Sequence, residues 1–97
     1  MTIPINVPNI DKEEIREVTS VLLEKSLTSS SFEGGKRVQQ FEHLLSKFVK
    51  SKFAIAVNSG TSALQASLYA LDIKSGDEVL VPSFTFVATA NSVKAVG

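Results

Sequence analysis

The stretch Val57-Asn58-Ser59-Gly60-Thr61-Ser62-Ala63-Leu64 decides the fold, because the sequence pattern changes within it. The apolar run 53–57, which ends at the first residue of this stretch, is short and unbroken, and it predicts a strand buried on both faces. After it, leucines recur at spacings of four and three residues, which predicts a helix over 62–71. The stretch is therefore expected to form a tight turn that joins the end of a strand to the start of a helix.

A second unit of the same kind follows this helix. Residues 74–77, Lys-Ser-Gly-Asp, predict a turn, and residues 78–81 predict a second buried strand. Residues 84–96 again suit a helix. Strand, helix, strand and helix in this order predict a βαβα unit over 53–97, with two parallel strands and a right-handed crossover. The expected fold class is therefore α/β.

The chain before this unit predicts an extended arm and two helices. Two prolines mark the arm, and amphipathic spacing predicts helices over 11–25 and 36–50. Asp11 and Glu14 have the spacing of a capping box at the start of the first helix. The Ser- and Gly-rich loop over 27–35 suits either a connector between the helices or a mobile binding loop. The predicted organisation is an arm over 1–9, a helical segment over 10–52 and the βαβα unit over 53–97.

Length, charge and composition exclude several classes of protein. The 97 residues suffice for one domain at most. Ten basic residues balance ten acidic ones, so the basic excess of nucleic-acid binders is missing. The chain has no cysteine and one histidine, which argues against disulfides, a cysteine nucleophile and a metal site. Its longest apolar run is far below the roughly 20 residues that span a bilayer, and with no secretory signal a cytoplasmic location is expected.

The predicted sheet is too small to be complete. Two parallel strands that are buried on both faces need further strands beside them and helices above and below. We therefore expect the chain to be an N-terminal fragment of a larger domain. Its exposed strand edges would favour oligomers or pairing with another chain.

The turn after Val57 has the components of a phosphate site. Backbone N–H groups at the start of a helix have no partner within the helix, and the positive end of the helix dipole lies behind them. Gly60 would let a ligand approach the backbone, while the hydroxyls of Ser59, Thr61 and Ser62 add neutral donors. The alternative is ordinary helix capping, for which serine and threonine are equally suited. The lysine of a nucleotide-binding P-loop and the three spaced glycines of a dinucleotide site are both missing.

Phe86 follows the second predicted strand, at the same edge of the expected sheet. Ligands of open α/β sheets bind beyond the carboxyl ends of the strands, so Phe86 could lie over a flat ring whose phosphate sits at the first turn. The alternative is that Phe84 and Phe86 are both core residues.

Three motifs in order, 58–64, 76–83 and 85–91, resemble the first half of the DegT–StrS family. Members of that family are fold-type-I aminotransferases that depend on pyridoxal 5′-phosphate and act mostly on nucleotide-linked keto-sugars. The resemblance implies that residues 1–97 form part of the large, cofactor-binding domain. It also implies that Gly60, Thr61 and Ser62 hold the cofactor phosphate and that Phe86 stacks on the pyridine ring.

The resemblance also implies what this chain does not contain. The family's Schiff-base lysine and the aspartate that pairs with the pyridinium nitrogen have no counterpart in these 97 residues, so no catalytic residue is assigned. The chain alone is expected to be inactive, whereas the full enzyme would use an amino-acid donor and act as a dimer. Three alternatives stay open: a non-catalytic phosphate- or nucleotide-binding module, the remnant of a truncated gene, and a structural or regulatory role through helix contacts.

Overall fold

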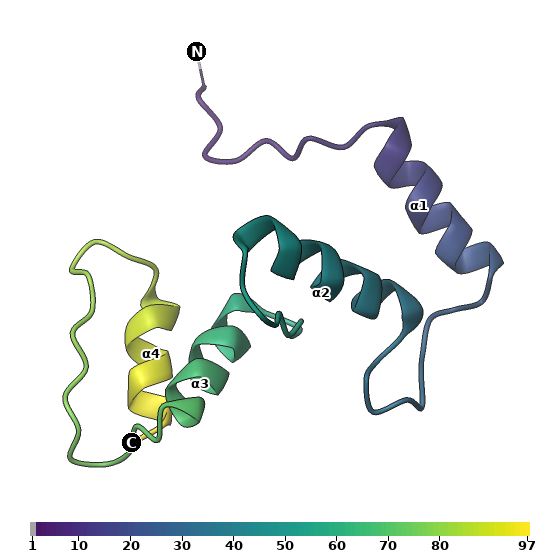
Figure 1. Cartoon of the computed structure of the whole chain (residues 1–97). Coiled ribbons are helices and arrows are strands. Elements are labelled where there is room, and N and C mark those ends of the chain that lie inside the picture. Colours follow the sequence, from purple (N-terminus) through teal and green to yellow (C-terminus); the bar gives the residue numbers. More distant parts are fainter. Residues whose placement is uncertain (1) are drawn as a thin grey trace. The chain divides into compact units, whose positions relative to one another are not determined.

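Residues 2–97 are the part of the chain that this computed structural model describes, and their regular structure is helical. The helices are drawn in Figure 1. Their bounds are α1 Lys12–Leu23, α2 Lys36–Val49, α3 Gly60–Ala70 and α4 Val87–Ala95. Each of the four predicted helices is confirmed, with ends that lie within three residues of the predicted ones.

The start of α1 is fixed by the predicted capping box. The Asp11 carboxylate accepts a hydrogen bond from the backbone N–H of Glu13 at 3.0 Å. In return, the Glu14 carboxylate accepts one from the backbone N–H of Asp11 at 2.9 Å. These bonds satisfy donors that the helix itself leaves without partners, so the capping box is confirmed.

Acidification should therefore unwind the start of α1. The hydrogen bond from Glu13, and then the one to Glu14, lower the pKa of Asp11 below its ordinary value of 3.8. The ionised form thus stabilises the fold above the unfolded pKa, and this stabilisation is lost as the pH falls through the lower, folded pKa. We expect helical circular dichroism at 222 nm to fall more steeply below about pH 4 in the parent chain than in Asp11→Asn, which caps without titrating. Superimposable curves would contradict this expectation.

Polar side chains link α1 to the first turn of α2. The Arg37 guanidinium donates to Glu17 at 3.2 Å, to Ser20 at 3.0 Å and to Glu24 at 3.4 Å. The Ser20 hydroxyl, and to a smaller extent the charge of Arg37, lower the pKa of Glu24. The connecting loop closes on itself, because the Gly34 carbonyl accepts bonds from Ser29 Oγ and Gln39 Nε2, each at 3.2 Å.

The predicted βαβα unit of parallel strands is wrong. Residues 2–97 contain no strand, and the two apolar runs, 53–57 and 78–81, are irregular connections. Neither run is buried as a whole, because Ile55 is 83% exposed and Leu80 is fully exposed. The physical reason is that a strand exists only through hydrogen bonds to a neighbouring strand, whereas here the Ala56 N–H donates to the Glu42 carboxylate at 2.7 Å. An apolar run shows a tendency to be buried, but it does not supply the partner.

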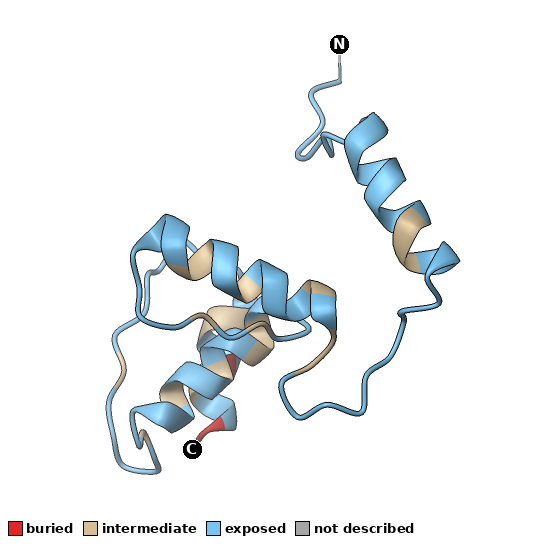
Figure 2. Ribbon diagram, turned by 45° about the vertical axis from the view of Figure 1, so that its right-hand side comes forward, coloured by how far each residue is buried: buried red, intermediate tan, exposed pale blue. Residues whose placement is uncertain are grey.

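The chain divides into two units, one that ends at Phe41 and one that comprises Glu42–Gly97. In the second unit α3 packs against α4. Within residues 2–97 the buried side chains are Ser92, whose hydroxyl donates to the Ala88 carbonyl at 2.7 Å, and Val96. Figure 2 accordingly shows exposed residues along nearly the whole ribbon. In the described part of the chain, every helix is too short or too polar to cross a membrane.

Candidate phosphate and ring site

The start of α3 is built by a network of short polar side chains. Ser59 is in an extended conformation and caps the helix, its hydroxyl accepting the Ser62 N–H at 3.1 Å. The Ser62 hydroxyl donates to Asn58 Oδ1 at 2.7 Å and lies 2.9 Å from the Ser59 hydroxyl. Both polar groups of Ser62 are therefore engaged in forming the turn.

In contrast to Ser62, the two residues before it have free backbone N–H groups. Among the hydrogen bonds of residues 2–97, none is donated by the backbone N–H of Gly60 or Thr61. A Cβ added to Gly60 would meet nothing within 4 Å, so the backbone there faces open space. The first turn of α3 carries no acidic residue that would repel an anion. Two free donors, an open approach and the positive end of an 11-residue helix are suited to a phosphate group.

Gly60, Thr61 and Phe86 line one hollow, which we call the Phe86 hollow. Its volume is about 570 Å³, within the usual range for small-molecule sites. Its walls come from α3, from Phe86 and from the start of α4, and consist of Gly60, Thr61, Ala63, Leu64, Ser67, Phe86, Ala88 and Thr89. The structure thus brings three of the four predicted site residues together, while Ser62 does not line this hollow.

Phe86 is held by the backbone rather than by packing. It precedes α4 in an extended conformation, and its carbonyl accepts the Thr89 N–H at 3.0 Å. Phe86 is 78% exposed, and Phe84 is fully exposed. Both phenylalanines are therefore exposed within the part of the chain that the structure describes. An exposed aromatic face that shares a hollow with the free amides of Gly60 and Thr61 can stack on a flat ring.

The Phe86 hollow contains no charged side chain and no titratable group. It can therefore bind a phosphate through neutral donors and the helix dipole, and it can hold a ring, but it has no residue that accepts or delivers a proton. The described residues also contain no cluster of three potential metal ligands. The residues present suit the phosphate and ring face of pyridoxal phosphate and offer no amine for its aldehyde.

Sequence reasoning missed the part played by Asn58 and Thr89. Asn58 anchors Ser62 from four positions earlier, and Thr89 pairs with Thr85 at 3.0 Å across the same spacing. The signal was a pair of polar residues spaced by four across a predicted helix start, which places the two side chains next to each other.

Comparisons with known proteins agree on one family. The sequence model of the DegT/DnrJ/EryC1/StrS aminotransferase family matches residues 8–97. The chain is 44% identical over 95 residues to the spore coat polysaccharide biosynthesis protein SpsC of Bacillus subtilis, covering 98% of this chain and 23% of that protein. It is 38% identical over 95 residues to the GDP-perosamine synthase of Vibrio cholerae, covering 98% of this chain and 25% of that enzyme.

A solved structure is similar in backbone as well. The aminotransferase from Psychrobacter cryohalolentis is 39% identical and gives a TM-score of 0.82, over 93% of this chain and 22% of that one. The chain therefore spans about a quarter of the length of the relatives it matches.

Proposed function

Since the chain belongs to the DegT/DnrJ/EryC1/StrS aminotransferase family, we propose that it supplies the phosphate-binding turn and a ring contact of a pyridoxal phosphate site. The observation that carries this proposal is the Phe86 hollow, where the free amides of Gly60 and Thr61 share one opening with an exposed phenylalanine. The 97 residues would then be part of the large, cofactor-binding domain.

Each residue has a defined task in this proposal. The N–H groups of Gly60 and Thr61 and the Thr61 hydroxyl bind the phosphate, and Phe86 orients the pyridine ring. Ser62 shapes the turn through Ser59 and Asn58, and its hydroxyl would have to release Asn58 in order to donate to the phosphate. When bound, pyridoxal phosphate supplies the aldehyde carbon and the electron-withdrawing ring that amino transfer requires.

The proposed activity of the whole protein is transfer of an amino group from an amino acid to a nucleotide-linked keto-sugar. Two observations support this activity. One is the family, and the other is that the name of a relative, GDP-perosamine synthase, refers to both a nucleotide and a sugar. A dimer is the proposed assembly. This chain supplies binding and orientation, because no titratable side chain lines its hollow.

The test is a comparison of pyridoxine 5′-phosphate with pyridoxine by calorimetric titration of the 97-residue chain. These compounds carry the cofactor's ring but no aldehyde, so they do not react with the chain's lysines. We expect the phosphate ester to bind at least about tenfold more tightly, since two charge-assisted N–H bonds together are worth more than 1.4 kcal/mol. Equal affinities would overturn the proposal.

Removing the Phe86 ring should weaken binding of the cofactor ring and leave phosphate binding intact. Stacking of aromatic rings is worth about 0.5–1.5 kcal/mol, so Phe86→Ala should weaken binding of pyridoxine 5′-phosphate by roughly 2- to 12-fold. Inorganic phosphate should bind the parent chain and the Phe86→Ala variant with equal affinity. The matched control is Phe84→Ala, because Phe84 is fully exposed and does not line the Phe86 hollow. If the two variants lost the same affinity, Phe86 would have no specific contact with the ring.

A further inference from the structure

The Arg37 side chain joins two helices that do not otherwise pack against each other. Its guanidinium donates to Glu17 at 3.2 Å, to Ser20 at 3.0 Å and to Glu24 at 3.4 Å. Among the described helices, α3 packs against α4, whereas α1 has no such contact with α2. The link between α1 and α2 is therefore made by one side chain, and it encloses the loop over 25–36.

The acceptors on α1 form a row. Glu17, Ser20 and Glu24 are spaced by three and four residues, which places their side chains along one side of the helix. The row is itself connected, because the Ser20 hydroxyl donates to the Glu24 carboxylate at 2.6 Å. A guanidinium has five N–H donors in a fixed planar arrangement, so it can bond several acceptors of such a row at once.

The place of Arg37 in its own helix indicates that these partners determine where its side chain lies. Arg37 is the second residue of α2, where the positive end of the helix dipole disfavours a cation. The first turn of α2 has no acidic residue that would offset this charge. Arg37 is thus unfavourable for α2 alone, and the carboxylates of α1 compensate it.

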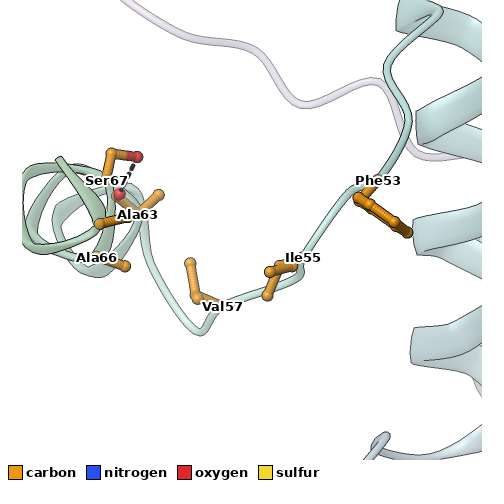
Figure 3. Close-up of a pocket in the computed structure, with 7 residues that line it drawn as sticks. Phe53, Ile55, Val57, Ala63, Ala66 and Ser67 are labelled. Carbon is orange, nitrogen blue, oxygen red and sulfur yellow. Dashed lines mark hydrogen bonds between the residues drawn. The ribbon is translucent and has the colours of Figure 1, made fainter.

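Charge distinguishes this cluster from the hollow between α3 and the segment that precedes it. Figure 3 shows that hollow, with Phe53, Ile55 and Val57 along the segment. All of its lining side chains are uncharged. A change in salt concentration therefore acts on the Arg37 cluster and has no ion pair to weaken in the walls of that hollow.

We propose that Arg37 is a charge-dependent strap, which holds the loop over 25–36 closed while its ion pairs are intact and releases the loop when they are lost. Exposed ion pairs are individually weak and are screened by salt. The side chains of Arg37 and Glu17 are 40% and 55% exposed, so the strap can open without unfolding a buried core. The loop is a connector in the closed state and a mobile segment in the open one. The strap requires no cofactor, so it does not depend on the function proposed for the Phe86 hollow.

The test is the distance between α1 and α2, measured by double electron–electron resonance between spin labels at Lys12→Cys and Gln40→Cys. The chain has no cysteine of its own, so the labels attach at these two positions alone. We expect one narrow distance distribution in the otherwise unchanged chain at low salt. Arg37→Gln should widen it at least about twofold, because residues 25–36 then behave as a flexible linker. Sodium chloride at about 1 M, where the Debye length is about 3 Å, should also widen it.

The matched control is Arg16→Gln, the same substitution at an arginine whose ion pair with Glu17, at 3.7 Å, lies within α1. This variant should keep the narrow distribution. Reversing the charges, with Arg37→Glu combined with Glu17→Arg and Glu24→Arg, should restore the narrow distribution, which a purely steric role of Arg37 would not do.

Two measurements keep the outcome decisive. Unchanged helical circular dichroism of Arg37→Gln would show that release of the loop is not loss of a helix. If that variant did lose helix, the charge-reversed chain would decide between a strap and a structural role. A broad distribution in the charge-reversed chain, a narrow one in Arg37→Gln, or equal widening in Arg16→Gln would each overturn the proposal.

Discussion

Replacing Gly60 by aspartate should weaken binding of pyridoxine 5′-phosphate about 30-fold or more and leave α3 folded. An aspartate in the first turn suits a helix, because its charge favours the positive end of the dipole. The same charge repels a phosphate dianion. At roughly 4 Å and with the dielectric constant of water, the repulsion is about 2 kcal/mol, which corresponds to about 30-fold in affinity. Calorimetric titration measures the affinity, and circular dichroism checks the helix.

The matched control is Gly60→Asn, which adds nearly the same volume without the charge. A Cβ at Gly60 meets no atom within 4 Å, so both substitutions are accommodated by the fold. We expect the asparagine variant to lose less affinity than the aspartate variant, because it only narrows the approach to the amides. Equal affinity of Gly60→Asp and the parent chain would mean that the phosphate binds elsewhere.

The second large effect is an absence of turnover. We expect the 97-residue chain, mixed with pyridoxal phosphate and glutamate, to form no 2-oxoglutarate above the rate without protein. Amino transfer needs groups that accept and deliver protons at the reacting carbon, and the residues lining the Phe86 hollow have none. Sustained formation of 2-oxoglutarate that is proportional to the chain's concentration would contradict this expectation. It would show that a lysine or a carboxylate outside the hollow takes part.

The parts of the fold that could be predicted are those specified by local sequence. Asp11 and Glu14 form the capping box from residues three positions apart, and the helices follow from periodic apolar spacing. The sheet could not be predicted, because a strand depends on a distant partner, and the apolar run 53–57 resembles a strand whether or not that partner is present. Ile55 is therefore exposed where burial was predicted.

The candidate site also contains features that depend on local sequence and features that depend on distant residues. The turn at Gly60 and helix capping by a serine, Ser59, could be predicted, because both depend on neighbours in the sequence. The proximity of Gly60 to Phe86 was predicted from strands that do not form. In the structure, the packing of α3 against α4 brings Gly60 and Phe86 into one hollow instead. Use of both the N–H and the hydroxyl of Ser62 within the turn depends on the rotamers of Asn58 and Ser59, which the four-residue spacing alone does not fix.

A ¹H–¹⁵N correlation spectrum of the labelled chain, recorded during titration with pyridoxine 5′-phosphate, tests the phosphate site at the start of α3 most directly. We expect the amide signals of Gly60 and Thr61 to move downfield in a saturable manner. The Ser62 amide, already bonded to Ser59, should move less, and pyridoxine should leave the signals of Gly60 and Thr61 in place. Unchanged Gly60 and Thr61 signals at saturating ester, or equal shifts with pyridoxine, would contradict a phosphate site at the start of α3.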